Sequence, residues 1–391
     1  MQILKNKTNI DFIGKRKPAI FLSSILNLAI LVGIAAFGFN LGVDFAGGTV
    51  VEVKFNHDIS ATEVRKRAEA GGLQDVTVQG IGGADENSFL LRMGGVTQLN
   101  QENADKAEAA IKGLGEVRSL YPDLANGIIN FRSASPLTAD AIKKAVEGSG
   151  TGVQEVRVLG EAQGGGFDYQ VVASGMADKV NSALSQGQAT PDFEQRRVDY
   201  VGPQVGKQLR NRGIMALLYS MVAILIYVAF RFDFKFGPGA LVAMVHDVIM
   251  VAGYYLVSRR EFNLTSIAAL LTVVGYSVND TIVIYDRIRE DMAKFKGKPF
   301  VEVINIAIND TLGRTILTSI TTALSLVGLL IFGVGEIFDF AMAMLVGIFV
   351  GVYSTIYIAS PLTIWLDERA AAKEARRQRE GGGIDRQPNA A

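Results

Sequence analysis

Residues 264–289 read LTSIAALLTVVGYSVNDTIVIYDRIR and contain an apolar run that is long enough to cross a bilayer. Asn279 and Asp280 lie inside this run. An aspartate near the centre of a membrane helix costs about 2.5 to 3.5 kcal/mol, so such residues usually face a bundle interior or a water path and need a partner. The stretch therefore predicts a membrane helix with a functional carboxylate, and the rest of the chain should supply the partner.

The composition also indicates a membrane protein. The 391 residues are 49% hydrophobic and have a formal net charge of +0, which is too apolar for an ordinary soluble enzyme and gives no indication of nucleic acid as a partner. The chain has no Cys, which excludes disulfides and thiolate metal sites. His57 and His246 lie far apart in the sequence, so we expect neither a metal centre nor a cofactor.

Six apolar runs predict a polytopic α-helical membrane protein with six transmembrane helices. Each run is near the roughly 20 residues that a spanning helix needs. The expected helices are residues 19–39, 213–230, 239–257, 264–285, 314–332 and 340–362. A cleaved signal peptide is the alternative for the first run, but the run is longer than a usual signal and no clear A-x-A site follows it.

The distribution of basic residues predicts the topology. Lys and Arg are abundant in residues 1–18, in a predicted loop at 286–313 and in the tail at 367–391, which the positive-inside rule assigns to the cytoplasm. Both termini are therefore expected inside, and residues 40–212 outside. The tail is charged and contains a triple Gly, so we expect it to be mobile.

Residues 40–212 are expected to form an exoplasmic α+β region. Strand-like alternation at 49–55 is followed by Ser60 and Glu63, which form a capping box at a helix start. The order strand, helix, strand, strand, helix, strand then occurs a second time after roughly 75 to 80 residues. We interpret this as a duplication of ferredoxin-like βαββαβ units, at about 49–121 and about 127–200, with turns at Gly82-Gly83 and at 164–166.

One stretch of this region invites a different interpretation. VGPQVGKQ at 201–208 is similar to a phosphate-binding loop, but its spacing is one residue short. Gln208 also replaces the Ser or Thr that would hold magnesium. We therefore do not expect nucleotide binding there.

The expected depth of Asp280 in the membrane predicts which residue is its partner. This residue lies about five residues, or about 7 Å, to the cytoplasmic side of the midpoint of its helix. The next predicted helix begins with Arg314 at the same face of the membrane. A long Arg side chain covers an axial offset of a few ångströms, so Arg314 is the expected partner, and the two residues are the expected proton path.

Other polar residues near this pair are candidates for supporting groups. Arg314, Thr318, Thr321 and Ser325 recur at helical spacing and predict an inward-facing polar stripe that could relay protons. The alternative is that these hydroxyls merely bond their own helix or a neighbouring helix.

Further support is expected from Asn279 and from the pair His246 and Asp247. Adjacent residues point about 100° apart on a helix, so His246 and Asp247 cannot both aim at Asp280. Asp247 is therefore expected to brace the site. Gly347 and Gly351 form a small-xxx-small surface that indicates helix packing.

Five motifs together resemble one known family. They are DFAGGT (44–49), VGPQVGKQL (201–209), HD (246–247), VGYSVNDTIVIYDRIRE (274–290) and LGRTILTSITT (312–322). This combination is similar to the SecF family of the bacterial protein-export machinery, within the resistance-nodulation-division (RND) superfamily. The match covers the membrane half and both junctions, whereas residues 56–198 are longer than is usual in that family.

The resemblance implies a function and partners. A SecF protein pairs with SecD in the bacterial inner membrane to form a twelve-span unit attached to the SecYEG channel. It uses the proton-motive force, without a cofactor, to help draw out preproteins that SecA has pushed in, and it is not an enzyme. The family's functional Asp and Arg correspond to Asp280 and Arg314, the residues that the depth argument selects. Membrane lipid is the remaining expected contact, and nucleic acid is not expected.

Three other functions compete with this interpretation. An RND-type exporter of lipids or small molecules would share the bundle, but normally carries both six-span halves in one chain. An intramembrane aspartyl protease could use Asp247 with Asp280, but its GxGD signature is absent. A scaffold that stabilises the translocase without transport is the third alternative.

Overall fold

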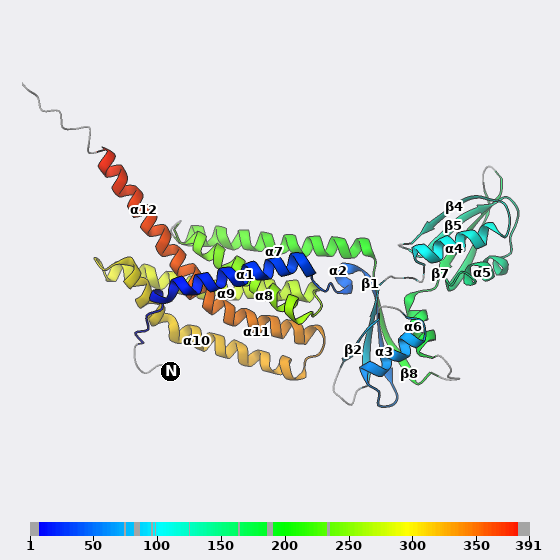
Figure 1. The fold of residues 1–391 in the computed structure, drawn as a ribbon, viewed down its shortest axis with the longest axis horizontal. Helices are drawn as coiled ribbons and strands as arrows, with labels where there is room; N and C mark the ends of the chain where they lie inside the picture. Colours follow the sequence, from blue (N-terminus) through cyan, green and yellow to red (C-terminus); the bar gives the residue numbers. More distant parts are fainter. Residues whose placement is uncertain are drawn as a thin grey trace, which may run out of the picture. The chain divides into compact units, whose positions relative to one another are not determined.

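The computed structural model describes residues 8–73, 76–81, 87–94, 97, 99–124, 126–162, 165–185, 191–232 and 235–381. The chain divides into two compact units. One unit combines Met1–Asn40 with Gly213–Ala391, and the other is Leu41–Arg212. Figure 1 follows the chain from blue to red, and the two units are described separately below.

The first unit is a helical bundle. Six helices are long and apolar enough to cross a membrane, as the sequence predicts. They are α1 (Arg16–Phe37, preceded by the 3-10 turn η1, Ile13–Lys15), α7 (Pro203–Arg231), α8 (Gly237–Ser258), α9 (Leu264–Lys294), α10 (Phe300–Phe332), and a last helix made of α11 (Glu336–Ser354), the π-helical segment η2 (Thr355–Ala359) and α12 (Ser360–Gly381).

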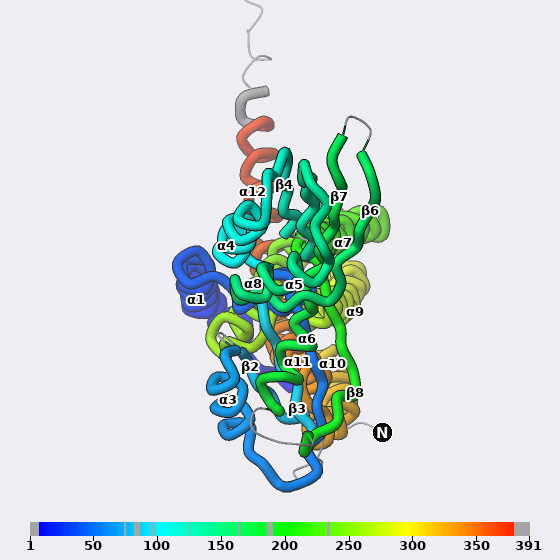
Figure 2. The backbone as a smooth tube through the Cα atoms, turned by 90° about the vertical axis from the view of Figure 1, so that its right-hand side faces the viewer, coloured from blue at the N-terminus to red at the C-terminus, as the bar shows by residue number. Residues whose placement is uncertain are grey.

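The helices of the bundle differ in how deeply they are packed. Figure 2 shows α1 on one side of the bundle and α9 and α10 on the other, with α8 and α11 between them. About half of the apolar window is buried in α8 (50%) and α9 (56%), but only 11% in α10. The surfaces of α1, α7 and α10 are therefore left for lipid or for another protein.

The connection predicted at 286–313 is mostly helical, so that prediction is wrong. Helix α9 continues to Lys294 and α10 begins at Phe300, which leaves five residues between them. Arg287 explains the extension, because it bonds Asp291 one turn later at 3.1 Å and also reaches Asp310 on α10. Such pairs stabilise polar helical turns beyond the apolar run.

The tail predicted to be mobile at 367–391 is also helical, through Gly381, and its last residues lie outside the described part. Near its start, the guanidinium of Arg369 lies 3.8 Å from the ring centroid of Trp365, a cation–π contact that orders this turn.

The second unit contains two four-stranded antiparallel sheets. One has the order β2-β3-β1-β8, and its strands are β1 (Gly48–Phe55), β2 (Thr77–Ile81), β3 (Ser88–Met93) and β8 (Phe193–Val201). The other has the order β4-β5-β7-β6, and its strands are β4 (Val117–Asp123), β5 (Ile128–Ser133), β6 (Val153–Glu161) and β7 (Phe167–Ala173).

Each sheet has its own core under two helices. In the first sheet, Val51, Val53 and Phe55 are buried against α3 (Ala61–Ala70) and α6 (Met176–Leu184). In the second sheet, β5 and β7 are buried against α4 (Gln101–Lys112) and α5 (Ala139–Glu147). Ser60 caps α3 by accepting from the Glu63 N–H at 3.2 Å, which confirms the predicted helix start and forms one of the two bonds of the predicted capping box.

The predicted grouping of strands into two consecutive units is wrong. The helices and strands occur in the predicted order, but β8 pairs with β1, and β4 pairs with β5. The last helix and strand of each predicted unit therefore belong to the other sheet. In the sequence, the strands of the second sheet all lie between β3 and β8 of the first. The register explains the choice, because pairing β1 with β8 sets Gly48 opposite Val201 and brings both ends of the region together.

Two of the sequence motifs meet where these ends lie. Helix α2 (Val43–Ala46) is followed by Gly47 at φ +79 and Gly48 at φ +143, conformations that favour glycine. A Cβ on Gly206 in the first turn of α7 would lie 3.1 Å from Gly47 N and from Phe45 O. The motifs at 44–49 and 201–209 are therefore close-packing motifs that contact each other.

The glycine turns and the loop-like stretch can also be located. Helix α7 begins at Pro203, so VGPQVGKQ is a strand end followed by a helical turn and not a phosphate-binding loop. Gly82-Gly83 and Gly164 lie outside the described residues, whereas Gly165 and Gly166 connect β6 and β7 at φ +86 and +99.

Candidate functional site

Asp280 is buried in the bundle and lacks a full set of partners. The residue is 3% exposed on α9, and its Oδ2 has no hydrogen-bond partner among the described residues. Buried polar atoms almost always have a partner, so an orphaned carboxylate oxygen inside a membrane helix marks a place for a proton, a water or a group from another chain.

Arg314 lies near Asp280 but does not contact it. No ion pair joins the two within the part of the chain that is described, and the Arg314 side chain is exposed on α10. The guanidinium is still close enough for its charge to act on the Asp280 carboxylate. The predicted direct pairing is thus not formed in this chain by itself, and its role in a proton path stays a prediction.

The polar stripe on α10 does not face the interior of this bundle. Thr321 and Ser325 are exposed, as is Arg314. Each hydroxyl bonds a carbonyl of its own helix, for example Thr321 to Leu317 O at 2.9 Å and Ser325 to Thr322 O at 2.7 Å. Thr318 behaves in the same way, with Thr315 O at 3.0 Å. The predicted inward orientation is therefore wrong, because the stripe lies on the outer surface of the isolated bundle.

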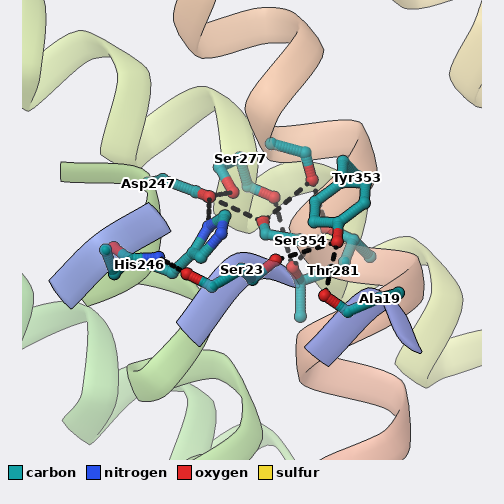
Figure 3. Close-up of polar contacts among 11 residues, drawn as sticks. Ala19, Ser23, His246, Asp247, Ser277, Thr281, Tyr353 and Ser354 are labelled. Carbon is teal, nitrogen blue, oxygen red and sulfur yellow. Dashed lines mark hydrogen bonds and ion pairs between the residues drawn. The ribbon is translucent and has the colours of Figure 1, made fainter. Parts of the chain in front are cut away.

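Asp247 is the centre of the buried hydrogen-bond network, which Figure 3 shows in close-up. It is 0% exposed on α8. Ser277 Oγ on α9 donates to its Oδ2 at 2.5 Å, and Ser354 Oγ at the end of α11 donates to the same oxygen at 2.8 Å. One carboxylate therefore ties three helices together, as expected for a bracing residue.

His246 bonds the other oxygen of the Asp247 carboxylate. Its Nδ1 lies 2.9 Å from Asp247 Oδ1, and its ring stacks on Tyr353 with centroids 6.0 Å apart. The residue is 6% exposed, and its Nε2 is buried without a partner among the described residues. The sequence predicts that the two side chains cannot both aim at Asp280, but it does not predict that they bond each other.

A second set of hydroxyls links the network to the neighbourhood of Asp280. Thr281 Oγ1 lies 2.9 Å from Thr355 Oγ1, which joins α9 to the last helix at the position next to Asp280. Thr355 begins the π-helical segment, and Ser360 Oγ donates to the Thr355 carbonyl at 2.8 Å. Helices widen in this way most often at functional sites.

Close helix packing makes these contacts possible. A Cβ on Gly351 would lie 3.0 Å from the Cβ of Ser277, and a Cβ on Gly347 would overlap Val273. The predicted small-xxx-small surface therefore packs α11 onto α9 and holds Ser277 against Asp247. Asn279, by contrast, is exposed on α9 and takes no part in this network.

Four members of the site were not predicted from the sequence: Ser277, Thr281, Ser354 and Thr355. Ser277 precedes Asp280 by three residues and so lies on its helix face, which is a signal that could have found it. Ser354 and Thr355 lie 107 and 108 positions after Asp247, and no spacing rule connects residues so far apart.

The two carboxylates are suited to different chemistry. Asp247 has donors on both oxygens and is held rigidly between helices. Asp280 has an open oxygen with a cation nearby and can gain or lose a proton without breaking a hydrogen bond to Oδ2. This division suggests a proton-responsive carboxylate supported by a fixed one.

Comparisons with known proteins show which family the chain resembles. Residues 180–369 match the family described as protein export membrane protein SecD/SecF, C-terminal, and residues 32–59 match the SecD/SecF GG motif. The protein translocase subunit SecF of Magnetococcus marinus is 38% identical over 96% of this chain and 97% of its own length. The subunit of the same name from Rickettsia rickettsii is 35% identical over 94% of this chain and 96% of its own.

Solved structures of SecDF are also similar. A crystal structure of SecDF from Thermus thermophilus, described as a translocon-associated membrane protein, is 28% identical with a TM-score of 0.60 and covers 94% of this chain. A SecDF structure in a super-membrane-facing form gives 28% identity and a TM-score of 0.58 over 96% of this chain. The present chain spans only 40% and 41% of those two longer chains.

Proposed function

This chain belongs to the SecF family of protein translocase subunits, and we propose that it uses protonation of Asp280 to couple the proton-motive force to preprotein export. It is an accessory subunit of the Sec translocase. The observation that carries the energy coupling is the orphaned Oδ2 of Asp280 inside the bundle, with the Arg314 charge nearby.

SecD is the proposed partner that completes the site. The chain spans about two fifths of the SecDF structures, and we propose that SecD supplies a second helical half. Helix α10 offers a surface for it, since Arg314, Thr321 and Ser325 are exposed beside large apolar side chains such as Leu324, which is 64% exposed. A partner helix on this face would enclose Arg314 and Asp280 in one proton path.

The proposed mechanism is a shift between two helix arrangements. An ionised Asp280 is attracted to the Arg314 guanidinium, and a protonated Asp280 is not, so a proton changes the relative stability of the two arrangements of α9 and α10. The cluster around Asp247 holds α8, α9 and α11 together during this change. Movement is thereby confined to the α10 side of the bundle.

The soluble unit is the proposed preprotein-contacting part. We propose that each sheet with its two helices is a ferredoxin-like βαββαβ unit, arising from a duplication in which the closing helix and strand were exchanged. The contact of Gly206 with Gly47 would link the start of α7 to α2 and so transmit movement between helix and sheet. Such movement would prevent an emerging preprotein from sliding back through the SecYEG channel after SecA has pushed it in.

The membrane orientation completes the proposal. Basic residues at Arg16, Lys17, Arg231, Arg287 and Arg289 gather at one end of the bundle helices, which the positive-inside rule places in the cytoplasm. Both termini would then lie in the cytoplasm of a bacterial inner-membrane protein, with residues 41–212 outside.

The test is export in membrane vesicles that contain the translocase and the SecD partner, with Asp280→Asn as the variant and Asp286→Asn as the matched control. Asp286 lies on the same helix, but its side chain is 42% exposed. We expect Asp280→Asn to assemble normally with SecD and to lose the part of export that the proton gradient enhances, whereas Asp286→Asn keeps it.

Two outcomes would contradict this proposal. Normal enhancement by the Asp280→Asn chain would show that its carboxylate does not couple the gradient. Unchanged export by the wild-type protein after the gradient is collapsed with an ionophore would show that it is a scaffold and not a proton-driven subunit.

A further inference from the structure

A cavity of about 640 Å³ lies in the bundle between α1, α8 and the last helix. Its volume falls within the roughly 300 to 1,000 Å³ range of small-ligand sites. The walls are mainly apolar, with Ile20, Val242, Val245, Ile249 and Leu362 among them. Neither the Asp280 site nor the exposed face of α10 contributes to it.

The length of this cavity corresponds to one leaflet of a bilayer. On α1 its lining extends from Arg16 to Asn27, a span of about 16 Å at 1.5 Å per residue. One leaflet contributes about 15 Å, half of the hydrocarbon thickness of about 30 Å. The cavity therefore runs from the end of the bundle to about the middle of the membrane.

The end of the cavity at the start of α1 is basic. Arg16 and Lys17 line it together with Trp365, whose ring is covered by the guanidinium of Arg369. Glu368 also lines this end, but Arg16 and Lys17 outnumber it, and this end therefore keeps an excess of positive charge. Basic pockets between membrane helices suit anionic lipid headgroups, and Trp is typical of the membrane interface.

His246 lines this cavity near the middle of α8. Its Nδ1 is bound to Asp247, and its Nε2 is buried without a partner among the described residues. Asn27 Oδ1 is a second buried acceptor without a partner, deeper along α1.

We propose that this cavity binds one acyl chain of an anionic phospholipid, with the phosphate on Arg16 and Lys17 and the chain running past His246. The apolar wall, the leaflet length and the basic end each match one part of such a molecule. Because His246 is bonded to Asp247, the bound lipid also stabilises the cluster that holds α8, α9 and α11 together.

The first experiment measures lipid retained by the full chain after purification with its membrane partner in mild detergent, by native mass spectrometry. The test variant is Arg16→Gln with Lys17→Gln. The control is Lys296→Gln with Lys373→Gln, which removes the same charge from residues that do not line the cavity. We expect phosphatidylglycerol to bind about 30-fold more weakly to the test variant, from about 1 kcal/mol per basic residue, and unchanged to the control.

The second experiment fills the cavity without changing charge. Val245→Trp places a large ring in the wall, whereas Val257→Trp on the same helix points away, since Val257 is 82% exposed and does not line the cavity. We expect only Val245→Trp to lose the retained lipid. Both variants should still assemble with the partner, which separates lipid loss from misfolding.

Three results would overturn the proposal. If the Arg16/Lys17 variant retained as much lipid as wild type, the proposed phosphate contact would be wrong. If wild type bound phosphatidylcholine as well as phosphatidylglycerol, the proposed preference for anionic lipid would be wrong. The chain has no Cys, so Val245→Cys introduces a single reactive thiol. Efficient cross-linking of this thiol to another protein would show that a partner helix, and not lipid, occupies the cavity.

Discussion

The two buried aspartates of the bundle have opposite surroundings. Asp247 accepts hydrogen bonds on both oxygens from three neighbours on α8, α9 and α11. Asp280, 3% exposed on α9, has an oxygen with no partner and an arginine that acts on it without contact. The same side chain thus braces helices in one place and remains available to a proton in the other, so hydrogen-bond saturation and not burial distinguishes the two roles.

The largest effect is expected from removing the saturated carboxylate. Asp247→Ala leaves two buried hydroxyls and an imidazole without their acceptor, each costing about 1 to 3 kcal/mol. We expect the free energy of unfolding to fall by about 3 to 5 kcal/mol, measured by denaturant titration in detergent. Asp286→Ala, at an exposed position, should change it by less than about 0.5 kcal/mol. Equal stability of the two variants would refute the bracing role.

Overpacking the helix contact should have the next largest effect. Gly351→Ala places a methyl group 3.0 Å from the Cβ of Ser277 and pushes this serine away from Asp247. We expect a loss of about 1 to 3 kcal/mol in the same titration. Gly275→Ala is the matched control on α9, because a Cβ there meets nothing within 4 Å. That variant should be unchanged or more stable by up to about 1 kcal/mol.

The orphaned carboxylate should contribute little to stability. Asp280→Asn breaks no hydrogen bond to Oδ2, so we expect the free energy of unfolding to stay within about 1 kcal/mol of wild type while proton-dependent export is lost. Comparison with Asp247→Ala in one experiment sharpens the contrast between the two residues. If Asp280→Asn lowered the free energy of unfolding as much as Asp247→Ala does, Asp280 would be a structural residue.

The smallest effect on stability is expected from a carboxylate outside the membrane bundle, which serves as a reference for the two buried aspartates. Asp168 on β7 accepts from Arg132 on β5 at 2.7 Å, and this hydrogen bond lowers the pKa of Asp168 below its usual value of 3.8. A lowered pKa contributes stability that is present above the unfolded-state pKa and is lost as pH falls through the folded-state pKa. We therefore expect a small loss of stability of the sheet unit below about pH 4.

Arg132→Gln is the control for this acid effect. The variant removes the donor that lowers the pKa of Asp168, so its stability near neutral pH should be slightly lower and its dependence on acid pH weaker. Thermal unfolding followed by circular dichroism at neutral and acid pH checks both. An unchanged acid dependence would mean that other carboxylates dominate it.

The exposed stripe on α10 illustrates a limit of periodicity. The spacing of Arg314, Thr318, Thr321 and Ser325 correctly placed them on one face, but spacing does not state which neighbour that face meets. In this chain the hydroxyls bond their own helix and the face is open. The neighbour that we propose for it belongs to another protein, which no pattern within one chain can identify.

The sheets illustrate a second limit. Because alternation and capping are local signals, they predicted the eight strands and the four helices between β1 and β8 in the right order, but not the short helix α2. Pairing between strands is not local, and the two closing strands have similar patterns. The return of both chain ends to one place, with Gly48 opposite Val201, selected β8 as the partner of β1.

The sequence by itself determined the class of this protein, its six apolar helices, the importance of Asp280 and the motifs of the SecF family. Those features depend on hydrophobicity, local propensity and the cost of a charge in lipid, all of which can be read residue by residue. Only the tertiary structure decided that Asp247 is the saturated centre, that Arg314 stays apart from Asp280, and that a cavity opens beside His246. These depend on which distant helices meet, and close packing of side chains fixes such contacts only when the whole chain is folded.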